Sequence, residues 1–241
     1  MKLALRTSYI FRRTATTAVD LLFPRRCYGC KAEGRYLCGD CFVRLPRLEA
    51  PYCHVCAEPL RGTARLCDRC WRQPLDIEGV RSVFLMEPPI SGMVYSLKYQ
   101  GVRELAPLLG ALLAEGYTRL GLETDVLVPV PLHWRRERQR GYNQSALLAA
   151  EAGAILGLPV EANALRRIRS TPQQVRAASG EERRATVTGA FAIGDAAPVT
   201  GKRVLLIDDV CTTGATLEAC AVALREAGAA GVWALTLARE G

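Results

Sequence analysis

The fold of this chain is decided by residues 204–216, which read VLLIDDVCTTGAT. Apolar residues run straight into two adjacent carboxylates, Asp208 and Asp209, and a loop of hydroxyl side chains with one glycine follows. Beyond the loop, apolar residues recur at helical spacing at Leu217, Ala221, Leu224 and Ala227. The pattern predicts a buried strand, a turn and an amphipathic helix, with the turn at the carboxyl end of the strand, where open α/β sheets bind ligands.

The turn after the predicted strand has the chemistry of a phosphate site. Its glycine allows close backbone approach, and the amides of a helix N-terminus together with the helix dipole favour an anion. Paired carboxylates beside a phosphate would repel it unless they held sugar hydroxyls or a divalent cation such as Mg²⁺. The turn therefore predicts a site for a phosphorylated sugar. The predicted phosphate ligands are Thr212, Thr213, Gly214, Ala215 and Thr216.

This stretch resembles the 5-phosphoribosyl-1-diphosphate (PRPP) motif of type I phosphoribosyltransferases. In that family the two acids contact the ribose hydroxyls, and the Thr/Gly loop binds the 5-phosphate. The resemblance implies that Asp208 and Asp209 are the catalytic pair, that residues 212–216 hold the phosphate, and that Mg²⁺ accompanies PRPP. A helix cap formed by Asp209 alone would need neither the second acid nor the threonine-rich loop.

Cysteine spacing gives the second strong signal. Eight of the ten cysteines form four Cys-x-x-Cys pairs. Such a pair places two thiolates on one metal ion, and two pairs complete a tetrahedral site. Sequential pairing predicts two structural zinc sites, and interleaved pairing satisfies the same spacing. The predicted ligands are Cys27, Cys30, Cys38 and Cys41 in one site and Cys53, Cys56, Cys67 and Cys70 in the other.

Composition sets bounds on the class of protein. The chain has 241 residues, 49% of them hydrophobic, and no apolar run approaches the roughly 20 residues that span a bilayer. We expect a cytoplasmic protein, because thiolate ligands need reducing conditions and no export signal is recognisable. The formal charge of +8 falls to roughly +4 once two Zn(Cys)₄ sites are counted. This charge is compatible with a nucleic-acid partner without requiring one.

The order of patterns along the chain predicts three parts: an N-terminal helix at 1–24, a double zinc ribbon at 25–73, and an α/β domain at 79–241 with a mostly parallel sheet. Residues 74–79 read as a linker. The expected strands are 80–86, 126–130, 163–165, 204–207 and 232–237, and the expected helices are 90–99, 104–117, 141–156 and 215–227.

Further basic segments fit a phosphorylated ligand. An arginine run over 135–140 follows a predicted strand and precedes a helix, so Arg140, Asn143 and Gln144 are candidates for diphosphate binding. A solvated basic loop or a nucleic-acid patch explains the same run. Lys98 stands at a helix end, where it either reaches a phosphate or favours the helix dipole. The long polar stretch 166–188 lies where phosphoribosyltransferases carry a flexible hood.

The motifs together extend over nearly the full chain. The double cysteine ribbon precedes LKYQG at 97–101, PVP at 129–131 and RGYNQ at 140–144, and the acidic motif follows. The chain thus resembles the competence protein F (ComF) family, bacterial proteins linked to DNA uptake in natural transformation and related to phosphoribosyltransferases. The resemblance implies a PRPP-binding, phosphoribosyltransferase-like protein acting in DNA uptake.

Two classes of function stay open from the sequence. An enzyme would transfer the phosphoribosyl group of PRPP to an acceptor, relying on positioning and electrostatics more than on a nucleophilic side chain. A non-catalytic module would bind single-stranded DNA or a helicase partner through the zinc ribbons, with the phosphoribosyl site as sensor or scaffold. The ribbon aromatics that stack on bases in this second class, or else pack around the metal sites, are Tyr28, Tyr36, Tyr52 and Trp71.

Overall fold

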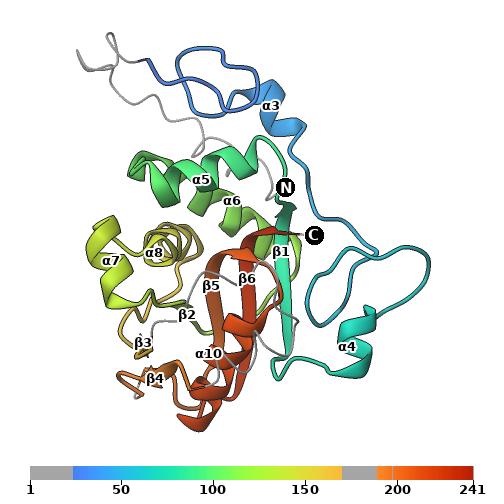
Figure 1. Cartoon of the computed structure of the whole chain (residues 1–241), viewed down its shortest axis with the longest axis vertical. Coiled ribbons are helices and arrows are strands. Elements are labelled where there is room, and N and C mark those ends of the chain that lie inside the picture. The colour runs from blue at the N-terminus through green and yellow to red at the C-terminus, as the bar shows by residue number, and fades with distance from the viewer. Residues whose placement is uncertain (1–23, 170–188, 197, 241) are drawn as a thin grey trace.

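A four-stranded parallel sheet forms the centre of the molecule, with strand order β1-β6-β5-β2 (Figure 1). The structure is a computed structural model, and it describes residues 24–169, 189–196 and 198–240. The predicted fold class, a mostly parallel α/β sheet with a small cysteine-rich N-terminal part, is confirmed. The strands of this sheet are β1 (Gly79–Leu85), β2 (Val126–Pro129), β5 (Arg203–Cys211) and β6 (Gly231–Arg239).

Strand β5 carries the acidic pair inside the sheet and not beyond its end. It continues to Cys211, whereas the sequence predicted an end at residue 207. The extension pairs with β6. In this register Asp208 lies opposite Thr236 and Cys211 lies opposite Arg239. Both carboxylates are therefore fixed by the backbone ladder at the carboxyl edge of the sheet.

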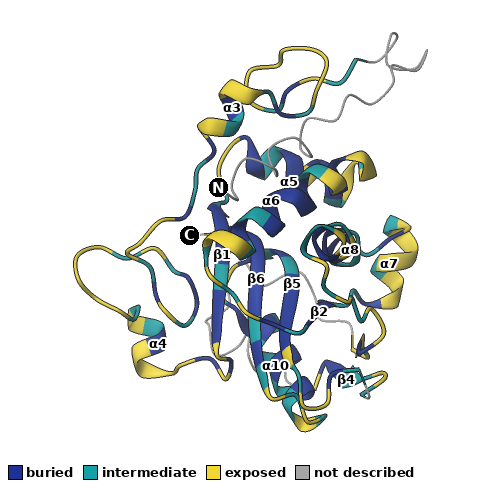
Figure 2. Ribbon diagram, turned by 180° about the vertical axis from the view of Figure 1, so that it is seen from behind, coloured by how far each residue is buried: buried dark blue, intermediate teal, exposed yellow. Residues whose placement is uncertain are grey.

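Helices cover both faces of the sheet, and the alternation along β5 shows how. Leu205 and Ile207 belong to an apolar cluster with α5, α6 and α8. Val204 and Leu206 belong to a second cluster, on the face covered by α10. The strands and the inward helix faces are accordingly buried (Figure 2). The helices are α5 (Ile90–Tyr99), α6 (Ala106–Arg119), α8 (Gln144–Leu156) and α10 (Ala215–Glu226), with a 3₁₀ turn, η1 (Arg103–Leu105), before α6.

The arginine run forms a helix of its own, α7 (Trp134–Arg140). The prediction of one helix over 141–156 is wrong at its start. Gly141 adopts φ +82° and ends α7, which a residue with a side chain would do only under strain. Asn143 then caps α8, its side chain accepting a hydrogen bond of 3.0 Å from the Ser145 amide.

A small antiparallel ribbon lies beside the sheet. It pairs β3 (Leu165–Arg167) with β4 (Phe191–Ile193). Strand β3 begins two residues later than predicted, and β4 was not predicted, since three residues give too short a pattern to detect. The expected N-terminal helix and most of the expected hood lie outside the described residues. Within the described part, no helix has the length and apolarity needed to cross a bilayer.

The two cysteine-rich ribbons contact different parts of the α/β domain, the first lying over α5 and the second beside β1 (Figure 1). They hold the short helices α3 (Gly39–Val43) and α4 (Asp68–Arg72). Cys27 and Cys41 pack into the cluster that contains α5, and Tyr28 contacts Gly92 of that helix. Cys53, Cys56 and Cys70 pack into the cluster on the α10 face. Between the ribbons, residues 46–48 run along β1: the Leu48 amide donates to the Val83 carbonyl, and the Leu85 amide donates to the Pro46 carbonyl.

The segment 74–79, expected to be a linker, packs closely on the α/β domain. Leu75 and Ile77 are buried in the cluster on the α10 face. The Asp76 amide donates a 2.9 Å hydrogen bond to the Glu218 carboxylate, and Arg225 pairs with Asp76. Residues 74–79 therefore pack along α10 and hold the second ribbon against the α/β domain; they do not form a flexible linker.

Candidate functional site

The acidic pair is the centre of the candidate site, and Lys98 reaches it from α5. The Lys98 ammonium lies 3.0 Å from Asp209 Oδ1, and Asp209 is only 2% exposed. Burial would lower the pKa of Lys98, but the charges of Asp209 and Asp208 outweigh it and raise the pKa. Asp209 Oδ2 is buried and has no hydrogen-bond partner among the described residues. One carboxylate oxygen is therefore paired with a cation, and the other is buried without a partner among the described residues.

Asp208 is held by a different set of groups. Its Oδ1 accepts hydrogen bonds from the Ser145 hydroxyl, at 2.7 Å, and from the Asp209 amide, at 2.9 Å. Burial, and next the charge of Asp209, raise the pKa of Asp208 to about 7. Alternation along β5 turns the two carboxylates to opposite sides of the strand, and different partners reach them: Lys98 of α5 pairs with Asp209, and Ser145, at the start of α8, bonds to Asp208.

Basic groups not singled out by the sequence as ligands gather near Asp208. His133 pairs with Arg167 through an isolated bridge, so the start of α7 lies against β3. Burial lowers the pKa of His133, and the charges of Arg135, Arg167 and Arg136 lower it further. The charge of Asp208 in turn acts on Arg167. Ser145 and Arg167 were missed as partners of Asp208, because only the fold brings them to β5. Arg136 belongs to the predicted basic run 135–140, and the fold places its charge beside Arg167.

The predicted phosphate loop, residues 212–216, lies at the start of α10. Gly214 has φ +83° and is the N-cap residue. The Ala215 amide donates to the Thr213 hydroxyl at 3.4 Å, and Thr212 is exposed. A side chain at position 214 would lie 2.6 Å from a methyl group of Leu75. Glycine is therefore required by the backbone conformation and also by this contact.

The predicted diphosphate ligands bond to each other and to the scaffold. The Arg140 guanidinium donates to the Gln144 amide oxygen and stacks on the Tyr99 ring, 5.6 Å from its centroid. The Asn143 side-chain amide donates to the Val130 carbonyl at 3.0 Å while its oxygen caps α8. Gln144 is buried. These residues shape the loop that leads into α8, and a role in ligand binding stays a prediction.

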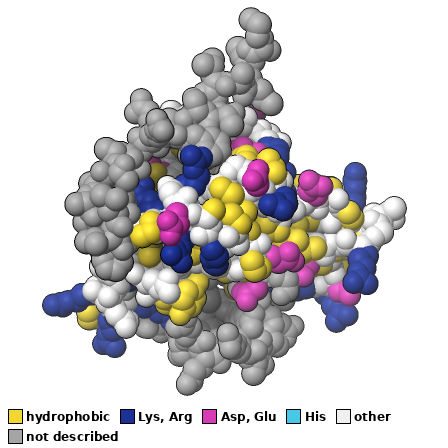
Figure 3. Space-filling view, turned by 90° about the horizontal axis from the view of Figure 1, so that it is seen from above, with side chains coloured by type: hydrophobic (Ala, Val, Ile, Leu, Met, Phe, Trp, Pro, Cys, Tyr) yellow, Lys and Arg dark blue, Asp and Glu magenta, His cyan; other side chains and the backbone are white. Residues whose placement is uncertain are grey.

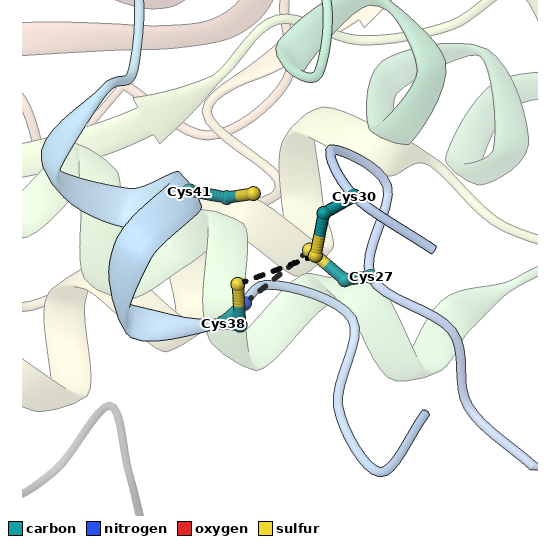
Figure 4. A group of neighbouring side chains, drawn as sticks. All are labelled: Cys27, Cys30, Cys38 and Cys41. Carbon is teal, nitrogen blue, oxygen red and sulfur yellow. Dashed lines mark hydrogen bonds between the residues drawn. The ribbon is translucent and has the colours of Figure 1, made fainter. Parts of the chain in front are cut away.

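The eight paired cysteines form two sites with sequential pairing, which resolves the alternative left open by the spacing. In each group of four, the sulfur atoms lie within 4.8 Å of one another. Figure 4 shows the side chains of Cys27, Cys30, Cys38 and Cys41 converging on one point. Cys30 and Cys38 are 3.6 Å apart at sulfur, and so are Cys56 and Cys67.

That geometry fits zinc. Tetrahedral Zn–S bonds of about 2.3 Å put neighbouring sulfur atoms roughly 3.8 Å apart. All ten cysteines are free of disulfides, and each site offers four thiolates with no open position. Backbone amides support the sulfurs, since Cys38 N donates to Cys27 Sγ at 3.4 Å and Cys70 N donates to Cys67 Sγ at 3.5 Å. Both sites are structural in type.

Charges of both signs are interspersed on the face that carries α5 and the first ribbon. In Figure 3, Lys and Arg side chains lie among acidic and apolar ones. Several exposed aromatics, however, are paired with arginines. Arg135 lies 5.2 Å from the centroid of Trp134, and Tyr95 and Tyr99 stand 5.1 Å apart on α5.

Comparison with known proteins supports this architecture. The Double zinc ribbon domain family matches residues 18–75, and the Phosphoribosyl transferase domain family matches residues 136–241. DNA utilization protein YhgH of Escherichia coli is 32% identical over 229 residues, covering 91% of this chain and 99% of that protein. Competence protein F of Haemophilus influenzae is 30% identical over 227 residues, covering 90% and 98%.

Competence protein ComFC of Bacillus subtilis is 29% identical over 212 residues, covering 85% of this chain and 84% of that protein. Among solved structures, glutamine phosphoribosylpyrophosphate amidotransferase from B. subtilis, complexed with ADP and GMP, aligns with 56% of this chain and 26% of that chain. The identity over the aligned part is 27% and the TM-score is 0.39.

Proposed function

This chain belongs to the competence protein F family, and on that premise we propose that it binds PRPP at the carboxyl end of β5 and acts in DNA uptake. One observation supports this ligand most strongly: two adjacent carboxylates lie in β5 just upstream of the loop 212–216, whose glycine is the N-cap residue of α10. The names of the relatives carry the role in DNA utilisation and competence.

Each part of the ligand has a matching group in the chain. In this proposal Asp208 and the unpartnered Oδ2 of Asp209 accept ribose hydroxyls, and the amides of residues 212–216 hold the 5-phosphate. Arg167 is influenced by the charge of Asp208, and the charge of Arg136 lies beside Arg167, so these two guanidinium groups are the proposed partners of the diphosphate of PRPP. Carboxylate and phosphate oxygens suit Mg²⁺, so the cation that accompanies PRPP fits this donor set and would help to neutralise the diphosphate.

As an enzyme, the chain would act by holding the ribose still while its arginines stabilise the departing diphosphate. In this proposal His133 has a packing role and His54 has no acid–base role. His133 is buried and its Nδ1 accepts from the Arg135 amide, and His54 lies inside a zinc knuckle. Transfer to an acceptor is the stronger form of the proposal, and PRPP binding is the weaker form on which it depends.

Titration calorimetry with PRPP, with and without Mg²⁺, tests the weaker form. We expect Mg²⁺-dependent binding by the zinc-loaded protein and none by Asp208→Asn/Asp209→Asn. Asp125→Asn is the matched control, because Asp125 pairs with Arg203 at the amino edge of the sheet, away from the site. Absence of binding by folded wild-type protein would reject a working phosphoribosyl site. Binding that persists in the double variant would reject the assignment to these acids.

A second function, binding of single-stranded DNA, is favoured by the exposed aromatics of α5 and α7. Tyr95, Tyr99 and Trp134 are 55–58% exposed, and arginines lie over two of their rings. Bases stack on such rings while the cations contact phosphates. In the ribbons, only Trp71 is comparably exposed among the described aromatics, at 78%. Tyr28, Tyr36 and Tyr52 pack against protein instead.

Fluorescence anisotropy with labelled oligo(dT) separates the two surfaces. Tyr95→Ala/Tyr99→Ala should weaken binding more than Trp71→Ala, and affinity should fall between about 50 and 200 mM salt. Equal affinity of the two variants would place the DNA elsewhere, and absence of binding by wild-type protein would reject this function. A helicase partner stays a prediction from the sequence.

A further inference from the structure

The phosphate loop, residues 212–216, is held from both sides by the second zinc ribbon. On the upstream side, the buried Arg239 guanidinium donates a 3.0 Å hydrogen bond to the Cys211 carbonyl and forms an ion pair with Glu58 of the ribbon. On the downstream side, Leu75 covers Gly214, and the Asp76 amide bonds to Glu218 in the first turn of α10. These contacts enclose the loop between two anchor points.

Both anchors depend on the fold of the second ribbon. Glu58 follows Cys56 directly after the knuckle, and its carbonyl accepts a 2.7 Å hydrogen bond from the Cys53 amide. Leu75 follows α4, which carries Cys70 and begins directly after Cys67. The metal ligands therefore set the positions of Glu58 and Leu75, because a ribbon of this size has little other core.

Charge also ties the ribbon to the end of β6. A Zn(Cys)₄ site carries a net charge of about −2. Two guanidinium groups contact this ribbon: Arg69, between Cys67 and Cys70, bonds to Cys56, and Arg239, at the end of β6, pairs with Glu58. Nε of each is buried without a hydrogen-bond partner among the described residues. The Glu58 carboxylate and the zinc-bound thiolates are the anions that compensate them.

The first ribbon makes a useful contrast. The first ribbon contacts α5 through Tyr28, which lies against Gly92. The segment that follows this ribbon holds to other elements: Arg47 forms a 2.8 Å ion pair with Glu115 of α6, and residues 46–48 pair with the edge of β1. The Arg47–Glu115 pair corresponds in type to the Arg239–Glu58 pair. It lies away from residues 212–216, which makes it a matched control.

We propose that Glu58, Leu75 and Arg239 are positioning residues that hold the phosphate loop in its binding conformation, so that zinc in the Cys53 site is linked to ligand binding at residues 212–216. Zinc in the Cys27 site is not linked in this way. An amide cradle binds an anion well only when its backbone is held in place beforehand, because ordering a loose loop costs affinity. The inference rests on the proposed phosphoribosyl site for its ligand, and its effect on the loop is independent of that ligand.

Hydrogen–deuterium exchange of the zinc-loaded full chain measures the loop directly. We expect the amides of residues 211–218 to exchange about tenfold faster in Arg239→Met and in Leu75→Ala than in wild type. Arg47→Met should leave them unchanged, and Arg239→Lys should restore part of the protection. Zinc content of two per chain in each variant ensures that the ribbons are folded. Unchanged exchange in both Arg239→Met and Leu75→Ala would overturn the inference.

The same variants in the PRPP titration separate this inference from the proposed function. If wild type binds PRPP, Arg239→Met should weaken binding about tenfold and Arg47→Met should not. If wild type does not bind PRPP but the loop is released in Arg239→Met, the positioning role stands and the proposed ligand fails. Cys67→Ser should release the loop and Cys38→Ser should not. Equal release by the two cysteine variants would overturn the link to the second zinc site.

Discussion

The ammonium of Lys98 lies 3.0 Å from a carboxylate oxygen of Asp209, and the two side chains are 20% and 3% exposed. A helix on one face of the sheet thereby supplies a permanent cation to the acidic pair in the central strand. A ligand that reaches Asp209 meets one oxygen already neutralised and one without a partner. The difference between the two oxygens of Asp209, one paired with Lys98 and one without a partner among the described residues, determines the electrostatics of the site.

Removal of Lys98 should destabilise the fold strongly. Lys98→Met leaves the buried Asp209 carboxylate without a counter-ion, and loss of one partner of a buried pair costs about 3–5 kcal/mol. Urea unfolding of the zinc-loaded protein measures the change. The double variant Lys98→Met/Asp209→Asn, which removes both charges, should recover much of the loss. A double variant no more stable than Lys98→Met would show that the pair is not coupled.

Asp208 should make stability fall as pH rises. Its pKa is about 7 in the folded chain, against about 3.9 when unfolded, so the folded state binds more protons between those values. The free energy of unfolding therefore declines from about pH 4 to 7. Asp208→Asn should flatten this decline and stabilise the protein at pH 8 by on the order of 1–3 kcal/mol. A pH profile identical to that of wild type would contradict the assignment.

Zinc content should follow the two sites separately. The intact chain is expected to hold two zinc ions, since each group of four sulfurs is complete. Cys38→Ser and Cys67→Ser should each lose one ion, measured by elemental analysis of the purified protein. Cys220→Ala is the control, because Cys220 is buried on α10 outside both groups. Loss of both ions from either serine variant would mean that the sites fold as one unit.

Replacing Gly214 by alanine should lower the stability of the fold more than replacing Gly201 by alanine. Both have positive φ, +83° and +70°, but a side chain at 201 meets open space whereas one at 214 meets Leu75 at 2.6 Å. Gly201→Ala should cost about 1 kcal/mol for the backbone alone. Gly214→Ala should cost about 1–3 kcal/mol more for the steric overlap. Thermal unfolding compares them, and equal losses would show that Leu75 yields freely.

Local patterns predicted the elements that hold the site. The run into Asp208 and Asp209, the turn at Gly214 and the helix after it follow from apolar periodicity and glycine chemistry. The helix over 90–99 was predicted with the bounds of α5. The grouping of neighbouring Cys-x-x-Cys pairs into one site each is seen only in the structure, because the cysteine spacing is the same for sequential and interleaved arrangements.

Long-range partners could not be read from the same patterns. Lys98 was assigned to a phosphate or to the helix dipole, but its partner Asp209 lies on a strand far along the chain. Ser145 and Arg167 likewise reach Asp208 only through packing. Even α7 was missed, because a run of arginines has no apolar face and its helix depends on the His133 cap and the turn at Gly141.

The pairing of residues 46–48 with β1 has a consequence for the outer border of the sheet. An edge strand presents unpaired amides and carbonyls, which invite a strand from another molecule. At one border the inter-ribbon segment occupies the Val83 carbonyl and the Leu85 amide. At the other, Leu127 of β2 exchanges hydrogen bonds with Pro159 and Glu161. Residues 46–48 and 159–161 thus occupy part of the hydrogen-bonding groups at the two edges of the sheet, which protects the sheet from aggregation by strand addition.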